Sequence, residues 1–290
     1  MLKAELVVDC RNTLGESVFW HPERASVFWT DIDGARLWRF DPETGDAESW
    51  PTPERFGSVA MRGTGGLVAA AASGLCFYDL DSGDVTPIAD VEADLSSTRL
   101  NDGRCDRQGR FVFGGYDEVD REPVSAVYRL DTDLTVHRLI PGVAVANSIC
   151  FSPDGGTMYF ADTPTRRIMA YDYDTAAGTV GARRVFCSLE DQPGSPDGSV
   201  VDAEGYLWNA QVHGHRVVRY APDGTVDRII EVPVKSPTCV GFGGADLDTL
   251  YITTLRRLRT AEELAAEPTL GGLFAVRPGV RGLPEPKFRG

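Results

Sequence analysis

The stretch Asp202–Trp208, DAEGYLW, decides the fold because copies of it recur along the chain. Each copy is a tight turn followed by a short apolar strand. Clear copies are HPERASVFW at 21–29, DRQGRFVF at 106–113 and SPDGGTMYF at 152–160. A second recurring element, typified by LWRFD at 37–41, lies between successive turns. The chain is therefore built from an internal repeat.

With looser copies included, both elements occur six times, and anchor residues from Phe28 to Leu250 are spaced by about 44 residues on average. A period of this size, with several short strands of β-branched and aromatic residues, is typical of a β-propeller blade. Frequent turns and the lack of long 3.6-residue periodicity disfavour a helical solenoid. We therefore predict an all-β, six-bladed β-propeller with a central channel, formed by residues 1–290 as a single domain.

The two ends of the chain are expected to share a blade. The N-terminal strand KAELVVD at 3–9 has no blade of its own, and the last blade runs out of chain after LFAVR at 273–277. We expect the N-terminal strand to complete that blade and close the ring, which removes an exposed sheet edge. One helical piece is predicted near Thr260–Leu264, where Thr260 and Glu263 have the spacing of a capping box.

Composition narrows the classes of partner. The net charge of −14 argues against nucleic acid or an anionic membrane as a partner and suits a small neutral substrate. The longest apolar stretch, at 65–78, is too short and too glycine-broken to span a bilayer. The N-terminus lacks the apolar region of a secretory signal, so we expect a cytoplasmic protein. Six scattered cysteines without a CxxC pair predict reduced, buried thiols.

Four side chains with oxygen donors share one phase of the repeat. Glu16, Asn101, Asn147 and Asp197 each lie six residues before the residue that opens the turn. In a propeller the first strand of each blade lines the channel, so equal phase predicts that all four lie at one mouth of it. Each alone is an ordinary turn or buried polar residue, but four separate turns have no reason to share both phase and chemistry. Such oxygen donors suit Ca²⁺, Mg²⁺ or Mn²⁺, with Zn²⁺ and Fe²⁺ as further candidates.

Other polar residues near these positions have weaker signals. Arg99 lies two residues before Asn101, and strand alternation would project both side chains to one side, where Arg99 is a candidate substrate contact. The pair His213 and His215 is a minor metal candidate, because no third nitrogen ligand accompanies it. Asp31 and Asp162 occupy matching places after a strand and are expected to brace their blades.

The motifs that carry these residues resemble a known family. They are LGES at 14–17, RLNDG at 99–103, ANS at 146–148 and SPDGSVVDAEGYLW at 195–208. In this order they resemble the senescence-marker-protein/gluconolactonase/regucalcin-like family, and the resemblance covers nearly the whole chain. It implies a six-bladed propeller with one catalytic divalent metal that hydrolyses sugar lactones to aldonic acids. Ser148 stands where the family commonly has glycine.

The resemblance also implies roles for single residues. Glu16, Asn147 and Asp197 match the family's metal ligands. Asn101 matches a ligand or substrate contact, Arg99 a substrate contact, and Glu118 approximately matches a substrate-binding acid.

We therefore expect metal-dependent hydrolysis of a small neutral sugar lactone of the gluconolactone type, with Asp197 as the general base that takes a proton from the attacking water. A pentonolactone such as xylono- or arabinonolactone is the alternative substrate. Other classes remain open: a Ca²⁺-binding regulatory propeller without turnover, hydrolysis of organophosphates or other esters, and a ring for docking proteins. The lack of a GxSxG elbow disfavours a covalent serine esterase. Nothing in the sequence indicates an oligomeric state.

Overall fold

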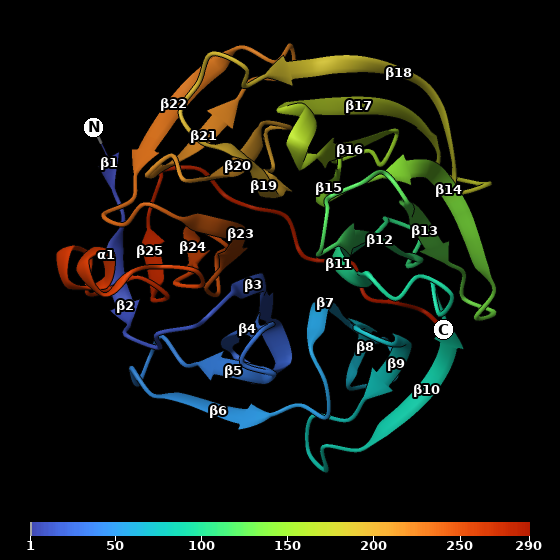
Figure 1. The fold of residues 1–290 in the computed structure, drawn as a ribbon, viewed down its shortest axis with the longest axis horizontal. Coiled ribbons are helices and arrows are strands. Elements are labelled where there is room, and N and C mark those ends of the chain that lie inside the picture. The colour runs from blue at the N-terminus through green and yellow to red at the C-terminus, as the bar shows by residue number, and fades with distance from the viewer. Residues whose placement is uncertain (1) are drawn as a thin grey trace. The chain divides into compact units, whose positions relative to one another are not determined.

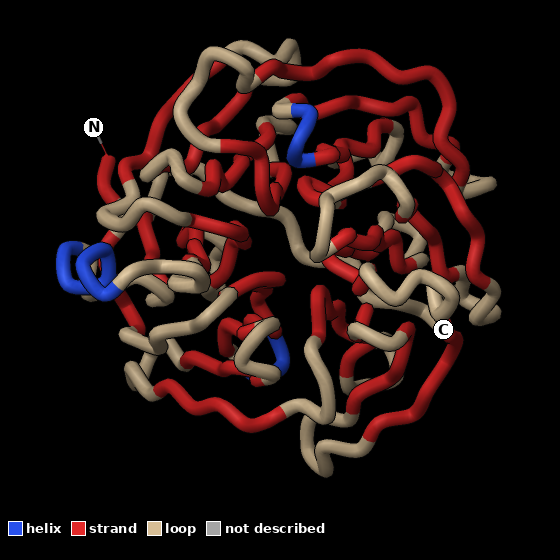
Figure 2. The backbone as a smooth tube through the Cα atoms, viewed as in Figure 1, coloured by secondary structure: helices blue, strands red, loops and turns tan. Residues whose placement is uncertain are grey.

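The computed structural model describes residues 2–290, and its regular structure is almost entirely β-strand (Figure 2). Six sheets follow one another along the chain, and each is built on a meander of consecutive antiparallel strands. The sheets are the blades of an all-β, six-bladed β-propeller, which confirms the predicted fold class.

The first of two compact units contains the residues up to Pro51 together with Leu189–Pro284, and it holds three blades (Figure 1). Its strands are β1 (Leu2–Lys3), β2 (Glu5–Val8), β3 (Gly15–His21), β4 (Ser26–Asp31), β5 (Arg36–Phe40), β6 (Ala47–Pro51), β19 (Ser195–Val201), β20 (Leu207–Val212), β21 (Arg216–Tyr220), β22 (Val226–Glu231), β23 (Pro237–Gly243), β24 (Thr249–Thr254) and β25 (Leu273–Val276). Its helices are the 3₁₀ turn η1 (Pro22–Arg24) and α1 (Ala261–Ala266).

The second unit contains Thr52–Ser188 and Glu285–Gly290, and it holds the other three blades. Its elements are β7 (Phe56–Met61), β8 (Leu67–Ala71), β9 (Gly74–Tyr78), β10 (Val85–Asp90), β11 (Thr98–Cys105), β12 (Phe111–Asp117), β13 (Ser125–Leu130), β14 (Val136–Val143), β15 (Ala146–Phe151), β16 (Thr157–Asp162), the 3₁₀ turn η2 (Thr163–Thr165), β17 (Arg167–Asp174) and β18 (Thr179–Ser188). A single domain over residues 1–290 stays a prediction.

The N-terminus completes the last blade as predicted. Strand β2 pairs antiparallel with β25, so the fourth strand of that sheet comes from the opposite end of the chain. Strand β1 adds a parallel fifth strand to the preceding blade by pairing with β22, which the sequence pattern did not indicate. Helix α1 begins at the predicted capping box, in which the Thr260 side chain accepts from the Glu263 amide and the Glu263 side chain accepts from the Thr260 amide.

We call the first strand of each blade its inner strand. Within the first unit β23 lies between β3 and β19, and within the second unit β11 lies between β7 and β15. Residues of the inner strands are mostly buried on both faces, because the blades within each unit pack against one another. Large apolar side chains such as Trp29, Phe111 and Trp208 are fully buried, and their removal from water stabilises the fold.

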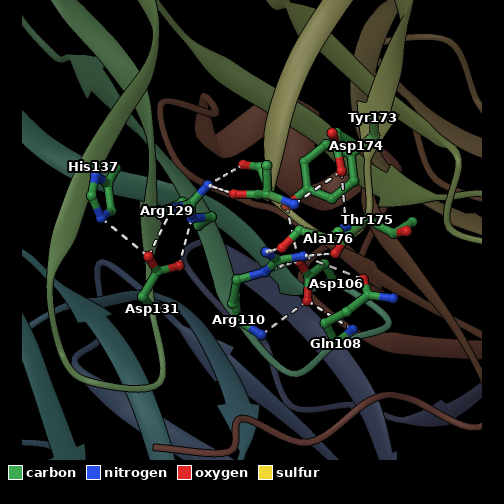
Figure 3. Close-up of polar contacts among 12 residues, drawn as sticks. Asp106, Gln108, Arg110, Arg129, Asp131, His137, Tyr173, Asp174, Thr175 and Ala176 are labelled. Atoms are coloured by element: carbon green, nitrogen blue, oxygen red, sulfur yellow. Dashed lines mark hydrogen bonds and ion pairs between the residues drawn. The ribbon is translucent and has the colours of Figure 1, made fainter.

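A polar network joins the turn between β11 and β12 to the turn between β17 and β18, and so connects two blades of the second unit (Figure 3). The Asp106 carboxylate is completely buried and accepts hydrogen bonds from the Arg110 guanidinium at 2.6 Å and the Tyr173 hydroxyl at 2.9 Å. Arg110 and Arg129 also donate to backbone carbonyls of the turn at 175–178 between β17 and β18. We call this set the outer network. It replaces water around carbonyls that the strands leave unpaired.

All six cysteines are free thiols, and five of them are buried as predicted. Burial raises the pKa of Cys150 well above its usual value, so this thiol behaves as a small apolar side chain. Among residues 2–290, none of the helices has the length and apolar character needed to cross a membrane.

Candidate functional site

The shared phase of the four oxygen donors corresponds to a β-bulge at the N-terminal end of each inner strand. In β3 and β15, Glu16 and Asn147 are the last paired residues before the register shifts. In β11 and β19, Asn101 and Asp197 directly follow the last paired residue. A bulge leaves an extra residue outside the ladder and re-aims its side chain, so the repeated phase has a physical cause.

Backbone strain accompanies two of these bulges. Ser17 and Ser148, which directly follow Glu16 and Asn147, have φ angles of 54° and 59°. This left-handed region favours glycine, which explains why glycine is expected at the position of Ser148. A non-glycine residue there stores about 1 kcal/mol or more, and strain of this kind concentrates at functional sites.

The four donors are buried but each keeps some exposed surface. The exposed fractions are 8% for Glu16, 8% for Asn101, 5% for Asn147 and 7% for Asp197. The first unit carries Glu16 and Asp197, and the second unit carries the two asparagines.

In the second unit a chain of hydrogen bonds links Arg99 to both asparagines. Arg99 donates from Nη1 to Asn101 Oδ1 at 2.6 Å. Asn101 donates from Nδ2 to the Ala146 carbonyl at 2.8 Å and towards Asn147 Oδ1 at 3.3 Å. Asn147 in turn donates from Nδ2 to Thr163 Oγ1 at 2.8 Å, which turns its oxygen away from Thr163. The Asn101 oxygen accepts a short bond from a cationic guanidinium, whereas the Asn147 oxygen accepts only a longer one from a neutral amide, so this arrangement favours Asn147 over Asn101 as a metal ligand.

Glu118 holds Arg99, the first residue in this series of hydrogen bonds, in place. Its carboxylate accepts from Arg99 Nε at 3.0 Å, and both of its oxygens accept from the Arg55 guanidinium at 2.9 and 2.8 Å. Burial alone would raise the pKa of Glu118, but the hydrogen bonds and charges of Arg55 and Arg99 outweigh it, and the net pKa lies below the usual value. Glu118 is therefore ionised at neutral pH and holds Arg99 in place. Its direct contact with substrate stays a prediction.

In the first unit, β23 contacts the strands of both carboxylates. Thr238 Oγ1 donates to the Gly15 carbonyl beside Glu16 at 2.5 Å. On the other side Gly198, next to Asp197, packs so closely on Cys239 that an added Cβ would lie 2.7 Å from its sulfur. Glu16 and Asp197 thus lie at the same end of three neighbouring inner strands.

Asp31 and Asp162 brace the donor segments, as expected. Asp31 accepts from the Leu14 amide at 2.9 Å, and Asp162 accepts from the Val145 amide at 2.9 Å. In both cases the braced amide lies two residues before a predicted ligand, Glu16 or Asn147. The equivalent contacts in two blades give these aspartates a positioning role.

Asp102 ties two neighbouring bulges together. Its Oδ2 accepts from the Ile149 amide at 2.8 Å, which joins the bulge of β11 to that of β15. Burial raises the pKa of Asp102 to about 6, although the hydrogen bond from Ile149 acts in the opposite direction.

The sequence did not single out Arg55, Thr163 or the bracing role of Asp102. Arg55 lies 63 residues from its partner Glu118, and a contact at that separation leaves no local pattern. Thr163 belongs to the turn η2 and reaches Asn147 only after the blade has folded.

The donor chemistry fits a divalent cation that prefers oxygen. Glu16 and Asp197 provide carboxylates, and Asn147 provides an amide oxygen whose nitrogen is held by Thr163. No group of three His, Cys, Asp or Glu side chains that could hold a metal is found within residues 2–290. His213 and His215 have different partners, namely Arg259 with Ser236, and Glu267.

The family model described as SMP-30/Gluconolactonase/LRE-like region matches residues 14–256. The chain belongs to this family. It is 44% identical to L-arabinolactonase of Azospirillum brasilense, over 99% of this chain and 96% of the relative. It is 37% identical to 6-deoxy-6-sulfogluconolactonase of Pseudomonas putida, over 98% of both chains. A crystal structure described as a calcium-binding protein, regucalcin, from Agrobacterium tumefaciens matches with a TM-score of 0.95 and 30% identity, over 100% of this chain and 98% of the other.

Proposed function

We propose that this protein hydrolyses a sugar lactone to the corresponding aldonic acid. The single observation that carries the substrate class is the 44% identity to an L-arabinolactonase over 99% of the chain. The oxygen donors at the bulges, together with Arg99, which is hydrogen-bonded to Asn101, support an enzymatic site. A five- or six-carbon aldonolactone is the proposed substrate, with the pentonolactone favoured by that same relative.

Glu16, Asn147 and Asp197 are the proposed ligands of one divalent cation. They are supported by their place at the bulges, by their oxygen chemistry and by their match to the family motifs. A bound divalent cation would supply a Lewis acid for the lactone carbonyl. Ca²⁺ is the first candidate, because a relative of the same fold is described as calcium-binding.

The protein's own residues supply the remaining functions in this proposal. A carboxylate oxygen of Asp197 takes a proton from the attacking water. Arg99 and Asn101 bind and orient the sugar hydroxyls, and Glu118 with Arg55 prevents Arg99 from turning away. Fixing donors before substrate arrives lowers the entropy lost on binding.

A calcium-binding propeller without turnover is the second candidate function. It is favoured by the similarity to the structure described as a calcium-binding protein. The same ligands would serve it, but it gives no role to the chain of hydrogen bonds from Arg55 to Asn147.

A pH-stat assay of pentono- and hexonolactones tests the proposal. Lactone hydrolysis releases a titratable acid, so we expect saturable acid release above the spontaneous rate for at least one aldonolactone. Binding of Ca²⁺ without accelerated hydrolysis of any lactone in the panel would instead support the regulatory alternative.

A further inference from the structure

A second polar cluster lies at the end of the first unit that carries Glu16 and Asp197. Arg259 Nη2 donates to Ser236 Oγ at 2.6 Å and to His213 Nδ1 at 3.0 Å, and Ser236 Oγ lies 3.3 Å from the same ring nitrogen. Ser236 is completely buried and the Arg259 side chain is 9% exposed, whereas His213 is exposed. Two largely buried groups thus hold one exposed imidazole.

The blade topology places this cluster near the proposed ligands. Consecutive strands of a blade are antiparallel, so the connection between its second and third strands lies at the N-terminal end of its inner strand. His213 belongs to such a connection, between β20 and β21, and Val212 beside it pairs with Ser195 in the strand of Asp197. Ser236 directly precedes β23, which contacts the strands of both Glu16 and Asp197.

Arg259 comes from the long connection between β24 and β25, which also contains α1. The second Arg259 nitrogen, Nη1, lies 3.4 Å from Glu263 Oε1, and Glu263 is fixed by the capping box of α1. The guanidinium is therefore held at both of its terminal nitrogens. The connection between β24 and β25 thus contacts the His213 imidazole through the Arg259 side chain.

The partners of His213 determine which ring nitrogen carries a proton. A guanidinium has donors only, so Nδ1 must accept from Arg259 and cannot itself be protonated. The neutral imidazole then carries its proton on Nε2, as a donor in fixed orientation. Hydroxyl and carbonyl oxygens are the groups that such a donor binds, and a sugar lactone has both.

The backbone at His213 is also unusual. His213 and His215 have φ angles of 66° and 54°, in the left-handed region that costs a side-chain-bearing residue free energy. Histidine and asparagine tolerate this region better than most residues. The strained turn directs the two imidazoles to different partners, since His215 lies 3.7 Å from Glu267.

We propose that His213 is a substrate-binding residue, whose Nε2–H donates to a hydroxyl oxygen of the sugar lactone while Arg259 and Ser236 fix the imidazole. The proposal rests on the lactonase function proposed above. It adds a sugar-binding side chain at the end of the first unit that carries Glu16 and Asp197. Discrimination between lactones that differ in one hydroxyl is the property that His213 would control.

The test compares His213→Asn with the matched control His215→Asn. Asparagine accepts the left-handed backbone at both positions, so the turn is preserved, but it is too short to replace the imidazole contact. For His213→Asn we expect KM to rise about tenfold with little change in kcat, the upper range for one neutral hydrogen bond. His215→Asn should leave both constants within about twofold of the wild type, because no substrate contact is removed.

Deoxy-lactones then separate a contact from a structural effect. If His213 binds one hydroxyl, His213→Asn should have no effect on KM for the analogue that lacks that hydroxyl. Unchanged kinetics of His213→Asn, or an equal KM increase for every deoxy analogue, would overturn the proposal. If the wild type still turns over a lactone in that case, the lactonase function itself stands. Absence of wild-type turnover with all lactones would overturn both.

Discussion

Two arginine–carboxylate networks of the second unit differ in where their hydrogen bonds end. The outer network centres on the buried Asp106, and Arg110 ends on backbone carbonyls of the turn at 175–178 (Figure 3). The inner network runs from Arg55 through Glu118 to Arg99, and it ends on the side-chain amide of Asn101. Both hold guanidinium groups against carboxylates, so composition alone does not distinguish them.

The difference shows what each network does. Bonds to backbone carbonyls complete the hydrogen bonding of a turn, so the outer network stabilises the contact between two blades. Bonds to side-chain amides beside a bulge set the direction of groups that remain accessible, as the 8% exposed Asn101 does. We therefore expect loss of the outer network to lower stability and loss of the inner network to lower catalytic activity.

The largest effect is expected at Asp197. Asp197→Asn removes the proposed base but keeps the shape of the side chain, so kcat should fall by about 10³-fold. Arg99→Ala should lower kcat far less and act mainly on KM, because Arg99 only orients substrate. Steady-state kinetics on folded variants measures both, and full activity of metal-bound Asp197→Asn would eliminate the assignment of the base.

The outer network is broken by Asp106→Asn. The variant leaves the buried Arg110 without its counter-charge, so the free energy of unfolding should fall by about 3 kcal/mol. Asp154→Asn, in the corresponding exposed turn of the next blade, should change it by less than about 0.5 kcal/mol. Urea denaturation gives both values, and kcat of the folded Asp106→Asn protein should be unchanged. A specific loss of kcat would contradict the division between the two networks.

The raised pKa of Asp102 predicts a pH dependence of stability. The folded-state pKa of about 6 lies above the unfolded value, so this contribution to stability is fully present below about pH 4 and is lost as pH rises through 6. Asp102→Asn keeps an acceptor for the Ile149 amide and has no charge to bury. Its stability relative to the wild type should therefore increase between pH 4.5 and 7.5, as read by urea denaturation. An equal difference at both pH values would show that Asp102 does not titrate in this window.

Arg55 tests how the inner network is held. Arg55→Met removes the two-pronged contact with Glu118, so KM should rise by about three- to tenfold, as one charge-assisted interaction is lost near the surface. Arg55→Lys should recover part of that loss, since it restores the charge without the fork. Arg184→Met, at an exposed ion pair with Asp172, is the control and should leave KM unaltered.

The smallest effect is expected at Ser148. Glycine accepts the left-handed backbone at φ 59°, so Ser148→Gly should raise the free energy of unfolding by about 0.5 kcal/mol after its own entropic cost. Ser199→Gly, at the first paired residue after the bulge of β19, where φ is not positive, removes the acceptor of a hydrogen bond from Asn209 and should destabilise instead. Thermal unfolding distinguishes the two, and a loss of stability in Ser148→Gly would show that the strain is not stored there.

The blades could be predicted from the sequence because their signals are local. Turn residues, strand alternation and the capping box at Thr260 and Glu263 all act within a few residues, and the structure has the predicted six blades and helix α1. The pairing of β1 with β22 was not predicted, because two residues of strand carry no pattern.

The candidate site could be predicted only in part. The six-residue phase predicted where the four donors lie along the inner strands, but it did not predict that a β-bulge occurs at each of these positions. In the last blade the register also shifts, after Pro237 in β23, but no oxygen donor was predicted there from the sequence. The partners of Glu118 and His213 depend on contacts between distant segments, and such contacts leave no trace in residue spacing.

The most direct test of the account is lactone hydrolysis followed in a pH-stat with the metal removed and restored. We predict that a chelator abolishes saturable hydrolysis of an aldonolactone and that one equivalent of a divalent cation restores it in the wild type. Glu16→Gln, which loses a proposed ligand, should need a much higher concentration of the cation. Undiminished hydrolysis by the thoroughly chelated protein would contradict the account.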